Sequence, residues 1–169
     1  SAVLSLLTLN CGLLRIGLFG RVLLEPAPFI AERLAALPAA LRDVDADIVA
    51  LQEIYSPAHK RAVTAALADR WPHAAVPPRR FLKLDSGLLV LSRYPVTAAS
   101  FHRFADAPAD ERRFVNRGFF ATLHEVPAIG PVRLLSFHTT AGGTRHDPEA
   151  EFTDAVRGKQ IAAILDFAG

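Results

Sequence analysis

Asn10, Glu53 and His138 each come directly after or at the end of an apolar run that has the length of a β-strand. The Glu53 carboxylate and the Asn10 carbonyl are hard oxygen ligands of the kind that Mg²⁺ prefers. An imidazole is a poor magnesium ligand, but it donates hydrogen bonds to phosphoryl oxygens and protons near neutral pH. Because ligands collect at the carboxyl edges of sheets, we expect the three side chains to share one site.

Each of these residues also has an ordinary structural role open to it. An asparagine can end a strand, a glutamate can begin a solvated loop, and a histidine can be a hydrogen-bonded turn residue. The occurrence of all three at separate predicted strand ends favours a shared site over three coincidences.

The elements that must position these residues begin as strand, helix and strand. The continuous apolar run 48–51 predicts a strand buried on both faces, and the run 2–9 predicts another. Apolar residues at helical spacing predict an amphipathic helix over 29–41 between them, with a kink or break at Pro38. Together they form one βαβ-like unit, and a second helix is predicted over 58–70.

The rest of the chain favours an antiparallel sheet followed by a helix. Short runs rich in aromatic and β-branched residues are separated by Gly, Pro or Asp. These runs are 80–84, 87–92, 96–104, 118–126 and 131–138. A helical period then returns over 148–167.

The segment 13–24 is unusually apolar for the loop predicted after the first strand. Arg15, Arg21 and the glycines at 12, 17 and 20 make a spanning helix unfavourable, so we predict no transmembrane segment and a soluble or peripheral protein. The large apolar side chains either fold back into the core or form a lip that contacts a membrane, with the two arginines at the level of the lipid headgroups.

The composition predicts one globular domain without a dominant charge. The 169 residues are 51% hydrophobic, which is enough for one substantial core. The 19 basic and 17 acidic residues nearly balance, so nucleic acid binding is allowed but not indicated. The single cysteine, Cys11, excludes an internal disulfide and Cys-based zinc patterns.

Four segments, in the same order along the chain, resemble the endonuclease/exonuclease/phosphatase superfamily. They are Leu-Thr-Leu-Asn-Cys at 7–11, Asp-Ile-Val-Ala-Leu-Gln-Glu-Ile at 47–54, Ser-Gly-Leu-Leu-Val-Leu-Ser-Arg-Tyr-Pro-Val at 86–96 and Ser-Phe-His-Thr-Thr-Ala at 136–141. Within the superfamily, 86–96, 116–120 and 138–139 most resemble the neutral sphingomyelinase-like branch.

The resemblance implies an α+β fold, a four-layer α/β/β/α sandwich of the DNase I-like type. It also implies a Mg²⁺-dependent phosphodiester hydrolase, with Mn²⁺ as an alternative metal and a phospholipid such as sphingomyelin as the substrate. Glu53 would hold the metal, Asn10 would lie in the metal and catalytic site, and His138 would contact the scissile phosphate as a catalytic residue. Asn116 and Arg117 would contact the substrate, although Arg117 also suits an ordinary surface arginine.

Two other functions stay open beside this one. A Mg²⁺-dependent nuclease of the same superfamily is the first, although DNA-repair members carry Gln-Glu-Thr-Lys where this chain has Gln-Glu-Ile-Tyr at 52–55. A non-catalytic truncated binding domain is the second, because the later Gly-Asp-x-Asn and Asp-His segments of the family do not occur in the sequence. We therefore expect residues 1–169 to be the N-terminal part, about the first half, of one such domain.

Residues 1–169 alone are predicted to be inactive on any phosphodiester. The missing segments orient and activate the attacking water, and general base catalysis contributes a factor of about 10² to 10⁴ in rate. The measurement is hydrolysis by a purified protein of this length, and turnover above a buffer control would contradict the prediction.

Overall fold

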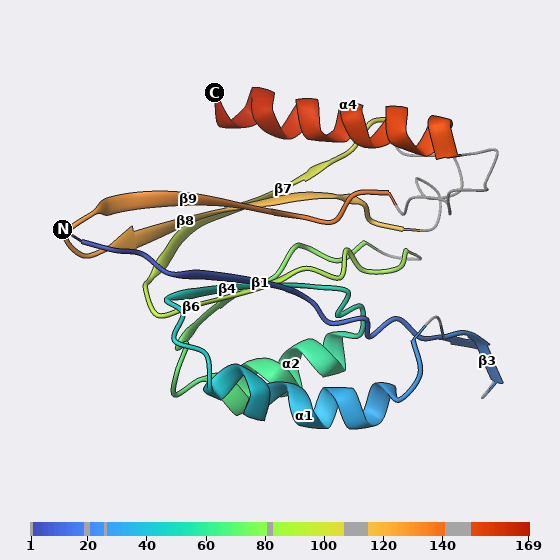
Figure 1. The fold of residues 1–169 in the computed structure, drawn as a ribbon, viewed down its shortest axis with the longest axis horizontal. Coiled ribbons are helices and arrows are strands. Elements are labelled where there is room, and N and C mark those ends of the chain that lie inside the picture. Colours follow the sequence, from blue (N-terminus) through green and yellow to red (C-terminus); the bar gives the residue numbers. More distant parts are fainter. Residues whose placement is uncertain (1, 19–20, 26, 81–82, 107–114, 141–149) are drawn as a thin grey trace.

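Four layers of secondary structure make up the computed structural model, which describes all residues except 1, 19–20, 26, 81–82, 107–114 and 141–149. Two β-sheets pack face to face in the middle. Helices α1 and α2 cover the outer face of one sheet, and helix α4 covers the outer face of the other (Figure 1). The predicted α/β/β/α sandwich is therefore confirmed.

The first sheet has four strands in the order β1-β4-β6-β5. These strands are β1 (Leu6–Asn10), β4 (Ile48–Gln52), β6 (Leu89–Ser92) and β5 (His73–Ala75). β1 and β4 are parallel, as the predicted βαβ unit requires, and β6 pairs antiparallel with both β4 and β5. The central strands β4 and β6 are almost wholly buried, which confirms the strand predicted to be buried on both faces.

The second sheet is antiparallel, in the order β7-β8-β9. Its strands are β7 (Val96–Arg103), β8 (Gly118–Val126) and β9 (Gly130–Phe137). The run 87–92 belongs instead to the first sheet, as β6. The strand predicted at 80–84 is wrong over its described residues: Leu84 makes one isolated bridge to Val115 before the chain turns at Gly87.

The helices are α1 (Ile30–Arg42), α2 (Pro57–Leu67) and α4 (Ala150–Ala168). A kink or a break was predicted at Pro38; the break is wrong, because α1 continues to Arg42. A proline costs a helix one backbone hydrogen bond, and here Leu37 and Leu41 on either side are buried in the core, which holds the last turn in place.

The sequence did not indicate two short elements. Strand β5 has only three residues, too few for a recognisable period. Residues 13–24 were predicted as an apolar loop, but they include an antiparallel hairpin of β2 (Ile16–Leu18) and β3 (Arg21–Leu24). Figure 1 shows this hairpin projecting beyond the end of the first sheet. Among the described helices, none is long and apolar enough to cross a membrane.

The two sheets are joined by an apolar cluster and by one buried histidine. Ile48, Val90 and Phe120 pack together between the sheets. His124 on β8 is fully buried, and its Nδ1 lies 3.0 Å from the Ser92 hydroxyl on β6 of the facing sheet. Burial lowers the pKa of His124, so the ring is neutral at pH 7 and links the sheets by a hydrogen bond rather than by charge.

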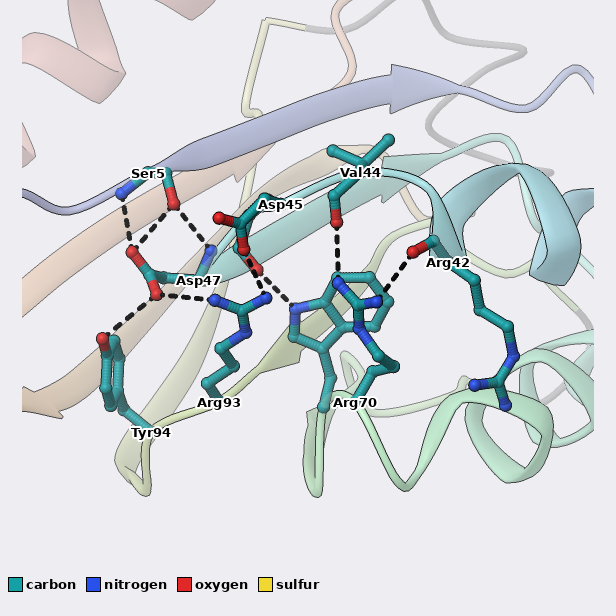
Figure 2. A network of polar contacts seen from close by, with 10 residues as sticks. Ser5, Arg42, Val44, Asp45, Asp47, Arg70, Arg93 and Tyr94 are labelled. Carbon is teal, nitrogen blue, oxygen red and sulfur yellow. Dashed lines mark hydrogen bonds and ion pairs between the residues drawn. The ribbon is translucent and has the colours of Figure 1, made fainter.

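Asp47, directly before β4, anchors the edge of the first sheet opposite to Asn10 and Glu53 (Figure 2). Its Oδ2 accepts hydrogen bonds from the Ser5 amide at 2.9 Å and the Ser5 hydroxyl at 2.8 Å. Its Oδ1 accepts from Tyr94 Oη at 3.1 Å and Arg93 Nη1 at 3.2 Å. The hydrogen bond from the Ser5 amide is the largest cause that lowers the pKa of Asp47, and burial opposes it.

Asp47→Asn is expected to lower the free energy of unfolding by about 1–3 kcal/mol at pH 7, because it removes the charge that these donors satisfy. The folded-state pKa lies below that of the unfolded chain, so this stabilisation is present above about pH 4 and is lost as the pH falls through the folded-state pKa. Urea denaturation of both proteins from pH 7 down to about pH 3 checks this. A difference that stays constant with pH would contradict the electrostatic origin.

Candidate active site

Glu53 follows the last residue of β4 in a left-handed backbone conformation, with φ 60°. This conformation costs a non-glycine residue about 1–3 kcal/mol, so it persists only where the surroundings impose it. Here the Glu53 carbonyl accepts from the Leu13 amide at 3.0 Å, and the next amide, of Ile54, donates to the Gly87 carbonyl at 3.0 Å. The backbone on both sides of Glu53 is therefore fixed, and its half-buried carboxylate points to a defined place.

Asn10 lies beside Glu53 because the parallel register pairs it with Gln52. Its Nδ2 donates to Glu53 Oε1 at 2.8 Å, and its Oδ1 accepts from the Gly12 amide at 2.9 Å. The second contact fixes which end of the side-chain amide faces Glu53, so Asn10 orients the carboxylate by donating to it.

His138 reaches the same carboxylate from the second sheet. It directly follows β9, and its Nε2 lies 3.5 Å from Glu53 Oε1. Its other ring nitrogen, Nδ1, lies 3.1 Å from Arg117 Nη1. The structure therefore brings Asn10, Glu53, Arg117 and His138 together across both sheets.

The surroundings of His138 favour a neutral ring. Burial is the largest cause that lowers the pKa of His138, the Arg117 charge lowers it further, and the Glu53 charge acts in the opposite direction. A guanidinium can only donate, so Nδ1 accepts from Arg117 and the ring proton resides on Nε2. A neutral ring of this tautomer presents an N–H donor on the Glu53 side of the site.

Helix α4 fixes the chain directly after His138. Gln160, which is 1% exposed, accepts from the Thr140 amide at 3.0 Å through Oε1 and donates to Thr140 Oγ1 at 2.8 Å through Nε2. The sequence does not indicate this role of Gln160, because a glutamine within a helical pattern carries no signal of a distant partner.

Helix α1 fixes the chain directly after Asn10 in a similar way. Arg33 donates to the Cys11 carbonyl at 2.7 Å and to the Gly12 carbonyl at 3.2 Å. Gly12 has a φ of +58°, which strains any other residue, and a Cβ there would lie 2.7 Å from Arg33 Nη2 and displace the guanidinium. Burial raises the pKa of the Cys11 thiol to about 12, which leaves it protonated and unreactive.

Asn116 is the predicted site residue that the structure does not bring to the others. Its side chain is 1% exposed and donates to the Pro78 carbonyl at 3.4 Å, while its backbone amide donates to the Leu84 carbonyl at 3.0 Å. In this arrangement Asn116 fixes the chain next to Arg117.

The donor atoms at the site suit a magnesium ion that keeps much of its water. The part of the chain that the structure describes contains no group of three or more His, Cys, Asp or Glu side chains that could hold a metal. Mg²⁺ commonly binds through one or two carboxylates, several waters and the phosphate of its substrate. Glu53 fits this pattern as the carboxylate, and the Asn10 carbonyl has a second lone pair beside the one that Gly12 engages.

The sequence profile of the endonuclease/exonuclease/phosphatase family matches residues 7–166. The chain belongs to this family. A comparison with curated proteins finds no match.

Solved structures of similar proteins share this fold. Sphingomyelinase C from Streptomyces griseocarneus is 26% identical, with a TM-score of 0.78 over 99% of this chain and 60% of its own. A β-hairpin deletion mutant of beta toxin from Staphylococcus aureus is 19% identical, with a TM-score of 0.81 over 99% of this chain and 61% of its own. A double mutant of that toxin with bound magnesium ions is also 19% identical, with a TM-score of 0.78 over 98% and 58% of the two chains.

These matches confirm the DNase I-like sandwich and the likeness to the sphingomyelinase branch of the family. The beta toxin structures, at 19% identity, show the fold alone. The chain spans 60% of the length of the Streptomyces enzyme.

The opposite charges of Arg117 and Glu53 should shift the pKa of His138 in opposite directions. In metal-free protein, Arg117→Gln should raise the pKa of His138, because it removes a charge that lowers this pKa. Glu53→Gln should lower it, because it removes a charge that raises this pKa. An NMR titration of the His138 ring protons measures both, with Arg133→Gln as the control for an arginine outside this cluster. Shifts in the same direction for the two variants would contradict the geometry.

Proposed function

We propose that the protein is a Mg²⁺-dependent phosphodiester hydrolase that acts on a phospholipid such as sphingomyelin. The convergence of Asn10, Glu53, Arg117 and His138 from two sheets carries the proposal, because it combines a fixed carboxylate, a cation and an N–H donor in one place. The 26% identity to sphingomyelinase C supports the choice of substrate. Residues 1–169 would form the N-terminal part of the catalytic domain.

Glu53 would hold the Mg²⁺, with Mn²⁺ as an alternative, and Asn10 would assist by orienting the Glu53 carboxylate or through its own carbonyl. A bound divalent ion would neutralise the charge that develops on phosphoryl oxygens, and this effect is worth several kcal/mol. The chain's own groups bind and orient the phosphate. Arg117 balances its negative charge, and the neutral His138 donates a hydrogen bond from Nε2 to a phosphoryl oxygen.

Glu53→Gln in the full-length protein should slow Mg²⁺-dependent sphingomyelin hydrolysis by about 100-fold or more. Losing about 3 kcal/mol of transition-state stabilisation from the metal corresponds to such a factor. His138→Ala should slow turnover while changing the half-saturating Mg²⁺ concentration much less. The measurements are initial rates over a range of Mg²⁺ concentrations, with circular dichroism as the control for folding.

Full activity of Glu53→Gln at limiting Mg²⁺ would refute the metal assignment. Hydrolysis of DNA by the wild type with no hydrolysis of sphingomyelin would instead favour a nuclease.

We further propose that the segment 13–24 gives the protein a peripheral contact with the membrane that holds its substrate. The β2–β3 hairpin projects from the sandwich (Figure 1). Arg15, directly before β2, pairs with Glu25, directly after β3, at 3.4 Å. Leu13 is excluded from this contact, because it is 2% exposed and packs in the core. A large apolar side chain that enters a membrane contributes about 1.5–3 kcal/mol, so two or three suffice for reversible attachment.

Replacing Leu18 and Phe19 with Ser tests this contact, although Phe19 lies outside the described residues. We expect weaker binding to sphingomyelin vesicles and slower vesicle hydrolysis, with unchanged hydrolysis of a soluble phosphodiester. Val76→Ser is the matched control, because Val76 is a half-exposed apolar residue elsewhere on the surface. Equal loss on both substrates with a lower melting temperature would show that the two residues stabilise the fold instead.

A further inference from the structure

The turn 84–88, which directly precedes β6 of the first sheet, contacts the backbone on both sides of the candidate active site. The Leu84 carbonyl accepts from the amide of Asn116, the neighbour of Arg117, at 3.0 Å. The Gly87 carbonyl accepts from the amide of Ile54, the neighbour of Glu53, at 3.0 Å. One short segment is therefore bonded next to the carboxylate of the first sheet and next to the cation of the second.

Gly87 also packs directly against Glu53. Its φ is +77°, and a Cβ at this position would lie 3.0 Å from Tyr55 Cε1 and 3.2 Å from both the Cα and the amide nitrogen of Glu53. Since Glu53 itself has a left-handed backbone, the close approach of Gly87 helps to hold a conformation that would otherwise relax.

The shape of this turn depends on a buried ion pair. Asp85 and Lys60 are 9% and 5% exposed, and Asp85 Oδ1 accepts from Lys60 Nζ. The same oxygen accepts from the Gly87 amide at 2.9 Å and lies 3.4 Å from the Ser86 hydroxyl. Lys60 comes from helix α2, whose first turn is capped by Ser56 only three residues after Glu53.

A buried ion pair of this kind contributes little net stability by itself. Removing both charges from water costs several kcal/mol for each ion, and an apolar pair of the same volume often stabilises a protein equally well. A buried pair does, however, hold its hydrogen-bond partners in one arrangement, and here those partners are the backbone and side chain of the turn that touches Glu53.

We propose that the Lys60–Asp85 pair is a positioning device for the metal site: it fixes the turn 84–88, and the turn fixes Glu53 relative to Arg117. The hydrogen bonds of the pair lead to the turn, so both residues act on the site through Gly87 and the backbone of Glu53. The effect on metal binding rests on the proposed function, whereas the effect on the backbone does not.

The test uses the full-length protein with two variants and one control. Lys60→Met combined with Asp85→Asn removes both charges without leaving one of them buried alone. Gly87→Ala keeps the pair and places a methyl group against the backbone of Glu53 and the ring of Tyr55. The control, Val63→Ala, removes a buried core contact one turn along the same helix α2 and lowers stability without touching the turn.

Amide hydrogen exchange at Ile54 and Asn116 is the first readout, and Mn²⁺ binding by titration calorimetry is the second. Relative to Val63→Ala, both test variants should exchange at least about tenfold faster at Ile54 and bind Mn²⁺ about tenfold more weakly, as is typical when the support of a metal ligand is lost. The double variant should also exchange faster at Asn116.

Exchange and Mn²⁺ binding that match the control would overturn the proposal. A wild-type protein that binds no Mn²⁺, together with the expected change at Ile54, would refute the metal site of the proposed function and still support the positioning of Glu53 by the pair.

Discussion

The parallel pairing of β1 with β4 is the constraint on which the candidate active site depends. It places the carboxyl ends of both strands at one edge, so that Asn10 and Glu53 become neighbours. Side chains alternate along a strand, and a slip of one residue would turn Asn10 to the opposite face of the sheet. The crossover through α1 permits this pairing, and Arg33 on the same helix then holds the turn after Asn10.

The second sheet completes the site, so the site exists only when the sandwich is assembled. Phe120 and His124 join the sheets through apolar contact and one neutral hydrogen bond. Their packing brings His138 and Arg117 to the Glu53 carboxylate. The proposed metal ligand on one sheet and the proposed phosphate-binding groups on the other are thus coupled to the stability of the core. A mutation that loosens the core should also separate the two halves of the site.

The strained backbone of Glu53 explains why so many supporting contacts surround it. A left-handed glutamate persists only where its surroundings determine its conformation. Contacts reach it from the turn after β1, from Gly87 and, through Gly87, from the Lys60–Asp85 pair. The direction of the carboxylate is therefore set by several elements of the first half of the chain.

The sequence by itself determined the residue types at the strand ends, the βαβ unit, the antiparallel strands after residue 96 and the family segments, because local periodicity and residue chemistry carry these features. It could not determine which distant groups support the site. Gln160, Arg33 and the Lys60–Asp85 pair resemble ordinary surface residues in the sequence, since a polar side chain carries no local sign of its partner across the fold. The neutral state of His138 likewise arises only from burial and from Arg117, and the continuity of α1 past Pro38 only from the packing of Leu37 and Leu41. Only the tertiary structure decided these features, because they arise from contacts between segments that are far apart in the chain.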